Sequence, residues 1–233
     1  AVLLRFNTPG GAVAAAEPIC REIQATAEKK PVYSYIDTTG ASLGYLLPNC
    51  TSFIYSRPDS ITGSIGVIVS LSDYNGIIEK LGGKTISISN KAGVEKTGEG
   101  LFEKDSVEYK RLQSMLDESY EYFVGKVWAG RKGKGKLTEA KLRELADGRV
   151  FSGKQAFEAG LVDKNLYFED VITDILSKEE SAFGDSKVEV VVYSLPTSPF
   201  SGIFGAMSSI SKMTTSEGSI NTRKMELLYL SQM

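Results

Sequence analysis

The sequence predicts an α/β protein with a largely parallel sheet, and two observations carry this prediction. In the first third of the chain, short runs rich in Val, Ile and Tyr alternate with segments whose apolar residues recur at helical spacing. Gly, Pro and Asn separate these runs. Strands and helices that alternate in this way connect through right-handed crossovers, so the strands lie parallel. The 233 residues, of which 42% are hydrophobic, are enough for one domain with a sizeable core.

The first 90 residues contain this alternation. Residues 2–6 are predicted to form a buried strand, ended by a turn of Asn, Thr, Pro and two glycines over 7–11. Apolar residues at helical spacing predict a helix over 12–30. A short helix is expected to start at Ser42 and to end at Pro48. The further strands expected here cover 32–36, 52–55, 66–71 and 84–89, and a further helix covers 74–81.

The middle of the chain is predicted to be helical. Asp105 with Glu108, and Ser152 with Gln155, have the spacing of capping boxes, in which each residue hydrogen-bonds the backbone of the other. An apolar stripe of about six helical turns follows the first pair. Thr138 is expected to cap the helix between the two pairs. The remaining elements are a helix over 168–176 and a strand over 188–193.

The composition shifts to Ser, Gly and Thr after residue 195. We therefore expect a domain over 1–195 and a weakly ordered tail over 196–233, with one short amphipathic helix over 223–230. The chain begins directly in a strand-like run, without an initiator Met or a signal peptide pattern. Leading strands and a membrane anchor could therefore lie outside it.

Charge and residue types exclude several classes of function. With 27 Lys and Arg against 29 Asp and Glu, the net charge of -2 offers no general attraction to nucleic acid. A basic run over 126–136 is better explained as a solvated loop than as a phosphate-binding surface, because glycines interrupt it. The chain has no histidine, which excludes Ser-His-Asp and Cys-His catalysis within it and the usual His-containing metal sites.

The two cysteines, Cys20 and Cys50, match no metal motif and are too few for a disulfide scaffold. We expect them to be two small buried hydrophobic side chains. The longest apolar run, near 65–71, is far shorter than the ~20 residues of a membrane span.

Two strand-to-helix turns are candidates for chemistry. In the turn over 7–11, two glycines could point backbone N–H groups at an oxyanion or a phosphate, although a plain tight turn is an equally good explanation. In the turn over 39–45, Ser42 lies at a helix start, where the helix dipole and the N–H of Leu43 would favour a nucleophile. The alternative is a serine that only caps the helix. A nucleophilic serine also needs a base, and without histidine a lysine is the best candidate.

These segments follow the order and spacing of a known family. The segments 7–11, 30–32, 41–45 and 61–67, together with the stretch over 144–163 that contains Asp-Gly-Arg-Val, resemble the signal peptide peptidase A family. The resemblance covers residues 1–195 and is most specific in the Thr-Gly-Ser-Ile-Gly and Asp-Gly-Arg-Val segments. It implies an α/β fold similar to the caseinolytic protease (ClpP) and crotonase superfamily, with stacked ββα units, a helical extension and an oligomeric assembly.

The resemblance also implies a Ser-Lys dyad, with Ser42 as the nucleophile and Lys96 as the general base. Leu43 replaces a small residue of the family pattern, so we expect its side chain to lie beside the substrate and to alter substrate preference. Thr97 stands where the family usually has Asp. The other implied site residues serve the oxyanion hole or the lysine: the backbone donors Gly11 and Leu43, the turn residue Gly10 and the lysine-orienting Ser64.

The implied function is that of a serine endopeptidase that cleaves signal-peptide remnants or other extended hydrophobic peptides through an acyl-enzyme, without a cofactor or a metal. The dyad is expected to be shared between protomers of a homo-oligomer, since burial at an interface would lower the pKa of a lysine from about 10.4. We expect a membrane-associated enzyme on the extracytoplasmic side of a bacterial-type membrane, soluble as given. The alternatives are a phage prohead-type protease of the same fold, a non-catalytic scaffold homologue, and a crotonase-like acyl-CoA enzyme, for which no cofactor-binding residues match.

Overall fold

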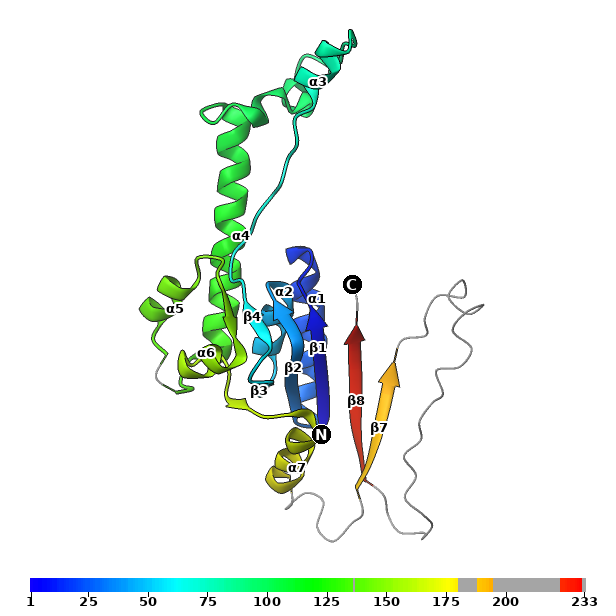
Figure 1. Cartoon of the computed structure of the whole chain (residues 1–233), viewed down its shortest axis with the longest axis vertical. Helices are drawn as coiled ribbons and strands as arrows, with labels where there is room; N and C mark the ends of the chain where they lie inside the picture. The colour runs from blue at the N-terminus through cyan, green and yellow to red at the C-terminus, as the bar shows by residue number, and fades with distance from the viewer. Residues whose placement is uncertain (136, 180–187, 195–222, 232–233) are drawn as a thin grey trace, which may run out of the picture.

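The computed structural model describes residues 1–135, 137–179, 188–194 and 223–231. Its body is built on a sheet of strand order β5-β4-β2-β1-β8-β7, and β3 and β6 add to it beside β2 (Figure 1). The strands are β1 (Val2–Thr8), β2 (Val32–Ala41), β3 (Phe53–Ser56), β4 (Ile61–Gly63), β5 (Val150–Ser152), β6 (Lys164–Asn165), β7 (Val188–Ser194) and β8 (Arg223–Ser231).

Helices connect most of these strands. The α-helices are α1 (Ala16–Ala27), α2 (Leu43–Leu46), α3 (Asn75–Lys80), α4 (Val107–Arg131), α5 (Glu139–Leu145), α6 (Gly153–Glu158) and α7 (Phe168–Lys178). The 3-10 turns are η1 (Val13–Ala15), η2 (Leu47–Cys50), η3 (Val94–Thr97) and η4 (Glu99–Phe102).

Strand β2 lies at the centre of the sheet. It pairs with β1 along one edge, and along the other edge it pairs first with β3 and then with β4. Among the described strands every ladder is parallel except that of β4 with β5. The predicted α/β fold with a largely parallel sheet is therefore confirmed. Because β1 and β2 are parallel neighbours, the two turns that follow them meet at the same edge of the sheet.

Both faces of the sheet are covered, which explains the apolar runs of β1 and β2. Along β1, Val2, Leu4 and Phe6 pack in one core with residues of α1 and α4. Leu3 points to the opposite face, where it packs in a second core with residues of α7. This alternation is the period of two that a strand imposes on its side chains.

A disulfide joins Cys20 of α1 to Cys50 at the end of η2, with the two Cα atoms 5.4 Å apart. Cys20 is fully buried as expected, but the prediction of two separate apolar side chains was wrong. The two cysteines are separated by 30 positions in the sequence, and only the packing of α1 against η2 brings them together. The bond ties together the two helical segments that follow the turn over 7–11 and the turn at Ser42.

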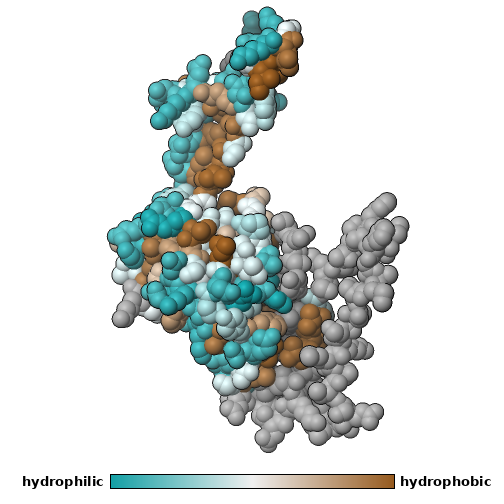
Figure 2. All heavy atoms as spheres, in the orientation of Figure 1, coloured by the Kyte–Doolittle hydropathy of each residue, from teal (hydrophilic) through white to brown (hydrophobic). Residues whose placement is uncertain are grey.

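Residues 68–112 form an arm that extends from the body and includes α3, η3, η4 and the first turns of α4 (Figure 1). Apolar side chains gather on its surface (Figure 2), and Leu81 and Ile88 are 83% and 91% exposed. Exposed apolar surfaces of this kind are typical of sites that contact other molecules. Further exposed apolar residues of the arm are Ile68, Tyr74, Ile77 and Ile86.

Three predicted elements were wrong. Residues 66–71 and 84–89 have no regular secondary structure and pair with no strand in the described part of the chain, because the arm leaves the sheet and no partner strand runs beside them. Residues 223–230 belong to β8, which pairs with β1 and β7, and do not form a helix. The weakly ordered segment expected over 196–222 lies outside the described residues.

The predicted helix caps are confirmed at Thr138 and at Ser152, where the capping box with Gln155 is complete. At the start of α4 the cap is Ser106 instead of Asp105, since the Ser106 side chain accepts the hydrogen bond that the first turn offers. No helix among the described residues is both long and apolar enough to span a bilayer.

The basic run over 126–136 is a solvated loop only in its second half, where residues 132–135 form a turn between α4 and α5. Its first half, up to Arg131, belongs to α4. Arg131 is buried and forms an ion pair with Asp163 at 2.8 Å. This positive charge is therefore part of the protein interior and does not face solvent.

Candidate active site

Ser42 lies where β2 ends and α2 begins, and its backbone is held from both sides. The Ser42 N–H donates to the carbonyl of Gly63 at 2.9 Å, and the Ser42 carbonyl accepts from the N–H groups of Tyr45 and Leu46 at 2.8 and 2.9 Å. Between these contacts Ser42 adopts φ 53° and ψ -122°, in a region that residues with a side chain rarely occupy. Its side chain makes no capping hydrogen bond to α2. The interpretation of Ser42 as a simple N-cap is therefore wrong.

The turn over 7–11 lies directly against Ser42. Gly10 has φ +128°, and a side-chain carbon placed on it would lie 2.8 Å from Ser42 Cβ and 3.2 Å from Ser42 Oγ. Only glycine fits here on both counts. The Thr8 hydroxyl shapes the turn, since it accepts from the Gly10 N–H at 3.2 Å.

Two backbone N–H groups flank the serine without an acceptor. Among the described residues, neither the N–H of Gly11 nor that of Leu43 has a hydrogen-bond partner. Gly11 is exposed, and Leu43 is the first residue of α2, where helix N–H groups are free and the helix dipole is positive. Two such donors beside a hydroxyl form the arrangement that stabilises an oxyanion.

The Leu43 side chain points into the protein. Leu43 is only 8% exposed and packs in the core that includes residues of α1 and α4. If Gly11 carried a Cβ, that atom would lie 3.4 Å from Leu43 Cδ2. The expectation that Leu43 lies beside the substrate was therefore wrong. The sequence shows that Leu43 is larger than the family's usual residue, but it does not show whether the side chain points toward the substrate or into the core.

Ser64 lies one residue beyond the Gly63 carbonyl that holds Ser42. It also has a positive φ, of 50°, and its N–H donates to the carbonyl of Arg149 at 2.8 Å. The structure thus brings together five of the six predicted site residues. The five are Ser42, Leu43, Gly10, Gly11 and Ser64.

Lys96 lies apart from this group, on the turn η3 of the arm. It is exposed, and its backbone N–H donates to the carbonyl of Gly93 at 3.0 Å. Its nearest surroundings are the residues of 87–90, with which it lines a small cavity. Within one chain, the structure does not bring Lys96 and Ser42 together.

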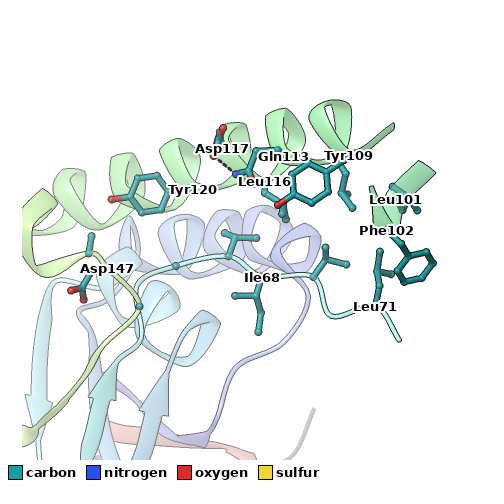
Figure 3. A pocket seen from close by; sticks show the side chains of 16 residues that line it. Ile68, Leu71, Leu101, Phe102, Tyr109, Gln113, Leu116, Asp117, Tyr120 and Asp147 are labelled. Atoms are coloured by element: carbon teal, nitrogen blue, oxygen red, sulfur yellow. Dashed lines mark hydrogen bonds between the residues drawn. The ribbon is translucent and has the colours of Figure 1, made fainter. Parts of the chain in front are cut away.

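A groove of about 710 Å³ runs between the extended segment over 66–71 and the exposed side of α4 (Figure 3). Figure 3 shows Ile68 and Leu71 on one wall and Leu116 and Tyr120 on the other. The segment that forms the first wall continues directly from Ser64. Its apolar lining is suited to an extended chain of hydrophobic residues.

Sequence reasoning missed the structural role of Gly63 and Thr8, which hold Ser42 and Gly10. The pairing of β2 with β4 was the missing information, because it places Gly63 opposite Ala41. No group of three or more Asp, Glu or Cys side chains in the described part of the chain could hold a metal ion.

Comparison with known proteins supplies independent findings. Residues 24–181 match peptidase family S49. A protein of Methanocaldococcus jannaschii named "Putative protease" is 37% identical over 205 residues, which are 88% of this chain and 62% of that protein. The "Putative signal peptide peptidase SppA" of Enterococcus faecium is 35% identical over 190 residues, 81% of this chain and 53% of its own length.

A third relative is the "Capsid assembly protease C" of Escherichia phage lambda, which is 31% identical over 175 residues, 74% of this chain and 38% of its own length. The chain spans between about half and three fifths of the length of the first two relatives. The predicted resemblance to signal peptide peptidase A is confirmed.

Proposed function

Because this chain belongs to peptidase family S49, we propose that it is a serine endopeptidase in which Ser42 attacks the substrate and Lys96 of a neighbouring protomer takes its proton. The observation that carries the proposal is Ser42 itself. A serine with a rare backbone conformation, no capping role and two unpaired N–H groups beside it has the geometry of an activated nucleophile.

The chemistry follows from these groups. The Ser42 Oγ adds to the peptide carbonyl, the N–H groups of Gly11 and Leu43 bind the resulting oxyanion, and the lysine amine accepts the hydroxyl proton. The same proton passes to the leaving amine, and the lysine then activates the water that hydrolyses the acyl-enzyme. Ser64 would orient the lysine amine.

The arm supports a dyad shared between protomers. Lys96 is remote from the Ser42 of its own chain, and the arm exposes apolar side chains that a second copy would cover. We propose a homo-oligomer with the stacked ββα arrangement of the ClpP and crotonase superfamily, in which residues 1–195 and the sheet strand β8 form the peptidase domain. The tail expected over 196–233 is thereby corrected, since β8 pairs with β1 and β7.

The proposed substrates are extended hydrophobic peptides, such as signal-peptide remnants, because most of the side chains that line the groove are apolar, although Gln113, Asp117 and Asp147 also line it. We place the enzyme at the extracytoplasmic side of a membrane, with an anchor outside this chain. The Cys20–Cys50 disulfide supports this location, since disulfides persist in oxidising compartments. A second candidate, proteolysis during capsid assembly, is favoured by the similarity to the phage lambda protease.

A fluorophosphonate probe tests the proposal. The wild-type oligomer should be labelled at Ser42, Ser42→Ala should lose the label and all turnover of an apolar internally quenched peptide, and Ser114→Ala, a change on the exposed surface of α4, should keep both. Lys96→Arg should be inactive, because arginine stays protonated. An oligomer that is folded but unlabelled would identify the chain as a non-catalytic scaffold and sink the proposal.

A further inference from the structure

The Asp-Gly-Arg-Val segment over 147–150 is the most specific sequence motif that the proposed dyad does not use. It forms the turn between α5 and β5. Asp147 and Arg149 are both exposed, and neither supplies a nucleophile, a base or an oxyanion donor. The backbone of this turn contacts the residues around Ser64.

The turn brackets Ser64 through the backbone. The carbonyl of Arg149 accepts from the Ser64 N–H at 2.8 Å, and the N–H of Gly148 donates to the carbonyl of Ile65 at 3.0 Å. One residue earlier, Gly63 is opposite Val150 in the β4–β5 ladder. The turn therefore contacts the backbone of Ser64 and of both its chain neighbours, Gly63 and Ile65.

This support matters because Ser64 has φ 50°. A residue with a side chain keeps a positive φ only when its surroundings impose it. The carbonyl of Gly63, just before Ser64, is also the group that accepts from the Ser42 N–H. A change in the turn would therefore move the Ser64 hydroxyl first and the backbone of Ser42 next.

Asp147 shapes the turn from within. Its Oδ1 accepts from the Arg149 backbone N–H at 3.1 Å and from Arg149 Nε at 2.7 Å, and Arg149 Nη2 donates to the second oxygen. These hydrogen bonds, with that of the Arg149 side chain foremost, lower the pKa of the Asp147 carboxyl to about 2. An exposed ion pair adds little stability. What the carboxylate contributes is the conformation of the turn, in which Gly148 takes φ +88°.

We propose that Asp147 and Gly148 are positioning residues, which fix the turn whose Arg149 carbonyl orients Ser64 and, through Gly63, Ser42. The inference rests on the proposed function. Asp147 and Gly148 also line the groove. The proposal concerns their effect on the rate of serine acylation, in addition to that place in the groove lining.

The first test is the rate of fluorophosphonate labelling at Ser42, resolved into the maximal rate kinact and the half-saturating concentration KI. Asp147→Ala should lower kinact by about 10-fold or more, because the reacting groups are misplaced. KI should stay within about twofold of wild type, because the fluorophosphonate group binds at Ser42 and not in the groove that Asp147 lines. Asp147→Asn should restore the rate, since the amide oxygen can still accept from the Arg149 N–H.

The matched control is Asp59→Ala. Asp59 also forms an exposed ion pair with an arginine two residues away, Arg57, at 2.6 Å, but on a turn that does not contact Ser64. The Asp59→Ala variant should react with the fluorophosphonate at the wild-type rate. All variants should keep the wild-type melting temperature and oligomer size.

A second pair of variants tests the turn without touching a charge. Gly148 and Gly133 have φ +88° and +79°, and a side-chain carbon on either would meet nothing within 4 Å. Both alanine variants carry the same backbone penalty. Gly148→Ala should lower kinact as Asp147→Ala does, whereas Gly133→Ala should not.

Each outcome decides the proposal. If wild type is not labelled, the proposed function fails. If wild type is labelled and both Asp147→Ala and Gly148→Ala react at its rate, or if only KI changes, the positioning role is overturned while the peptidase stands. An Asp147→Asn variant as slow as Asp147→Ala would overturn the role of the backbone cap.

Discussion

The body and the arm hold their candidate catalytic residues in opposite ways. In the body, Ser42 is fixed by backbone hydrogen bonds to β4 and α2 and by the close approach of Gly10. In the arm, Lys96 lies exposed on a single 3-10 turn among apolar side chains that nothing in the described chain covers. The body arranges its candidate residues by its own fold, whereas under the proposed function the arm would gain a defined environment only against another protomer.

Complementation between inactive subunits would test this division most strongly. Ser42→Ala and Lys96→Ala oligomers should each be inactive, and mixing equal amounts under subunit exchange should restore about a quarter of the sites, because half of the subunits still carry each group. Lys91→Ala, a change of another exposed arm lysine, should stay active alone. No activity after exchange, verified by mass spectrometry, would show that the dyad is not shared in this way.

Within the body, substitution of Gly10 and substitution of Gly11 should have very different effects on peptidase activity. Gly10→Ala places a carbon 2.8 Å from Ser42 Cβ at φ +128°, and should lower kcat about 100-fold by displacing the nucleophile. In Gly11→Ala the new side-chain carbon would contact only Leu43 Cδ2, at 3.4 Å, so the loss of kcat should be far smaller. Peptidase assays at equal folded concentration, checked by circular dichroism, compare the two. Equal losses would show that the turn does not contact the serine as described.

The disulfide should stabilise the body and leave the arm unchanged. Closing a loop of 30 residues between Cys20 and Cys50 contributes about 3–4 kcal/mol by constraining the unfolded chain. The double variant Cys20→Ala and Cys50→Ala should therefore melt about 10 °C lower. Hydrogen exchange in α3 should stay at the wild-type rate. An unchanged melting temperature under oxidising conditions would mean that the bond does not form in solution.

Acid should also weaken the body, by a smaller amount. Glu17 of α1 contacts Lys126 of α4 at 2.6 Å, and this hydrogen bond, with those of Tyr122 and Arg21, lowers the pKa of Glu17 to about 2. Since the folded-state pKa is lowered, the stabilisation is complete above about pH 4.5 and is lost as the pH falls toward 2. Glu17→Gln should flatten the urea-unfolding stability between these values. A profile identical to wild type would exclude Glu17 as a contributor.

The sequence predicts the body far better than the arm, for a physical reason. The buried strands 2–6 and 32–36 and the caps at Thr138 and Ser152 depend on local pattern and chemistry, and all were confirmed. The run over 66–71 has the composition of a strand, but a strand also needs a partner. Pairing is a property of the whole fold, and the arm leads this segment away from the sheet.

The same limit applies to the candidate site. The turns that carry Gly11 and Ser42 could be predicted from the glycines and from the strand-to-helix junctions, because parallel neighbours bring such turns together. The inward direction of Leu43 and the Cys20–Cys50 disulfide could not, since each depends on contacts between segments far apart in the sequence. The proposed place of Lys96 beside a serine would likewise depend on a second chain.

The positive φ angles of Ser42 and Ser64 have a consequence for how this protein can evolve. Each such residue costs about 1–3 kcal/mol of folding free energy, which a glycine would not incur. Selection for thermal stability alone would therefore drive both positions toward glycine and extinguish the activity. Laboratory evolution toward higher stability should therefore measure turnover in every round, because a substitution to glycine at either serine would stabilise the fold and remove a group that the proposed function needs.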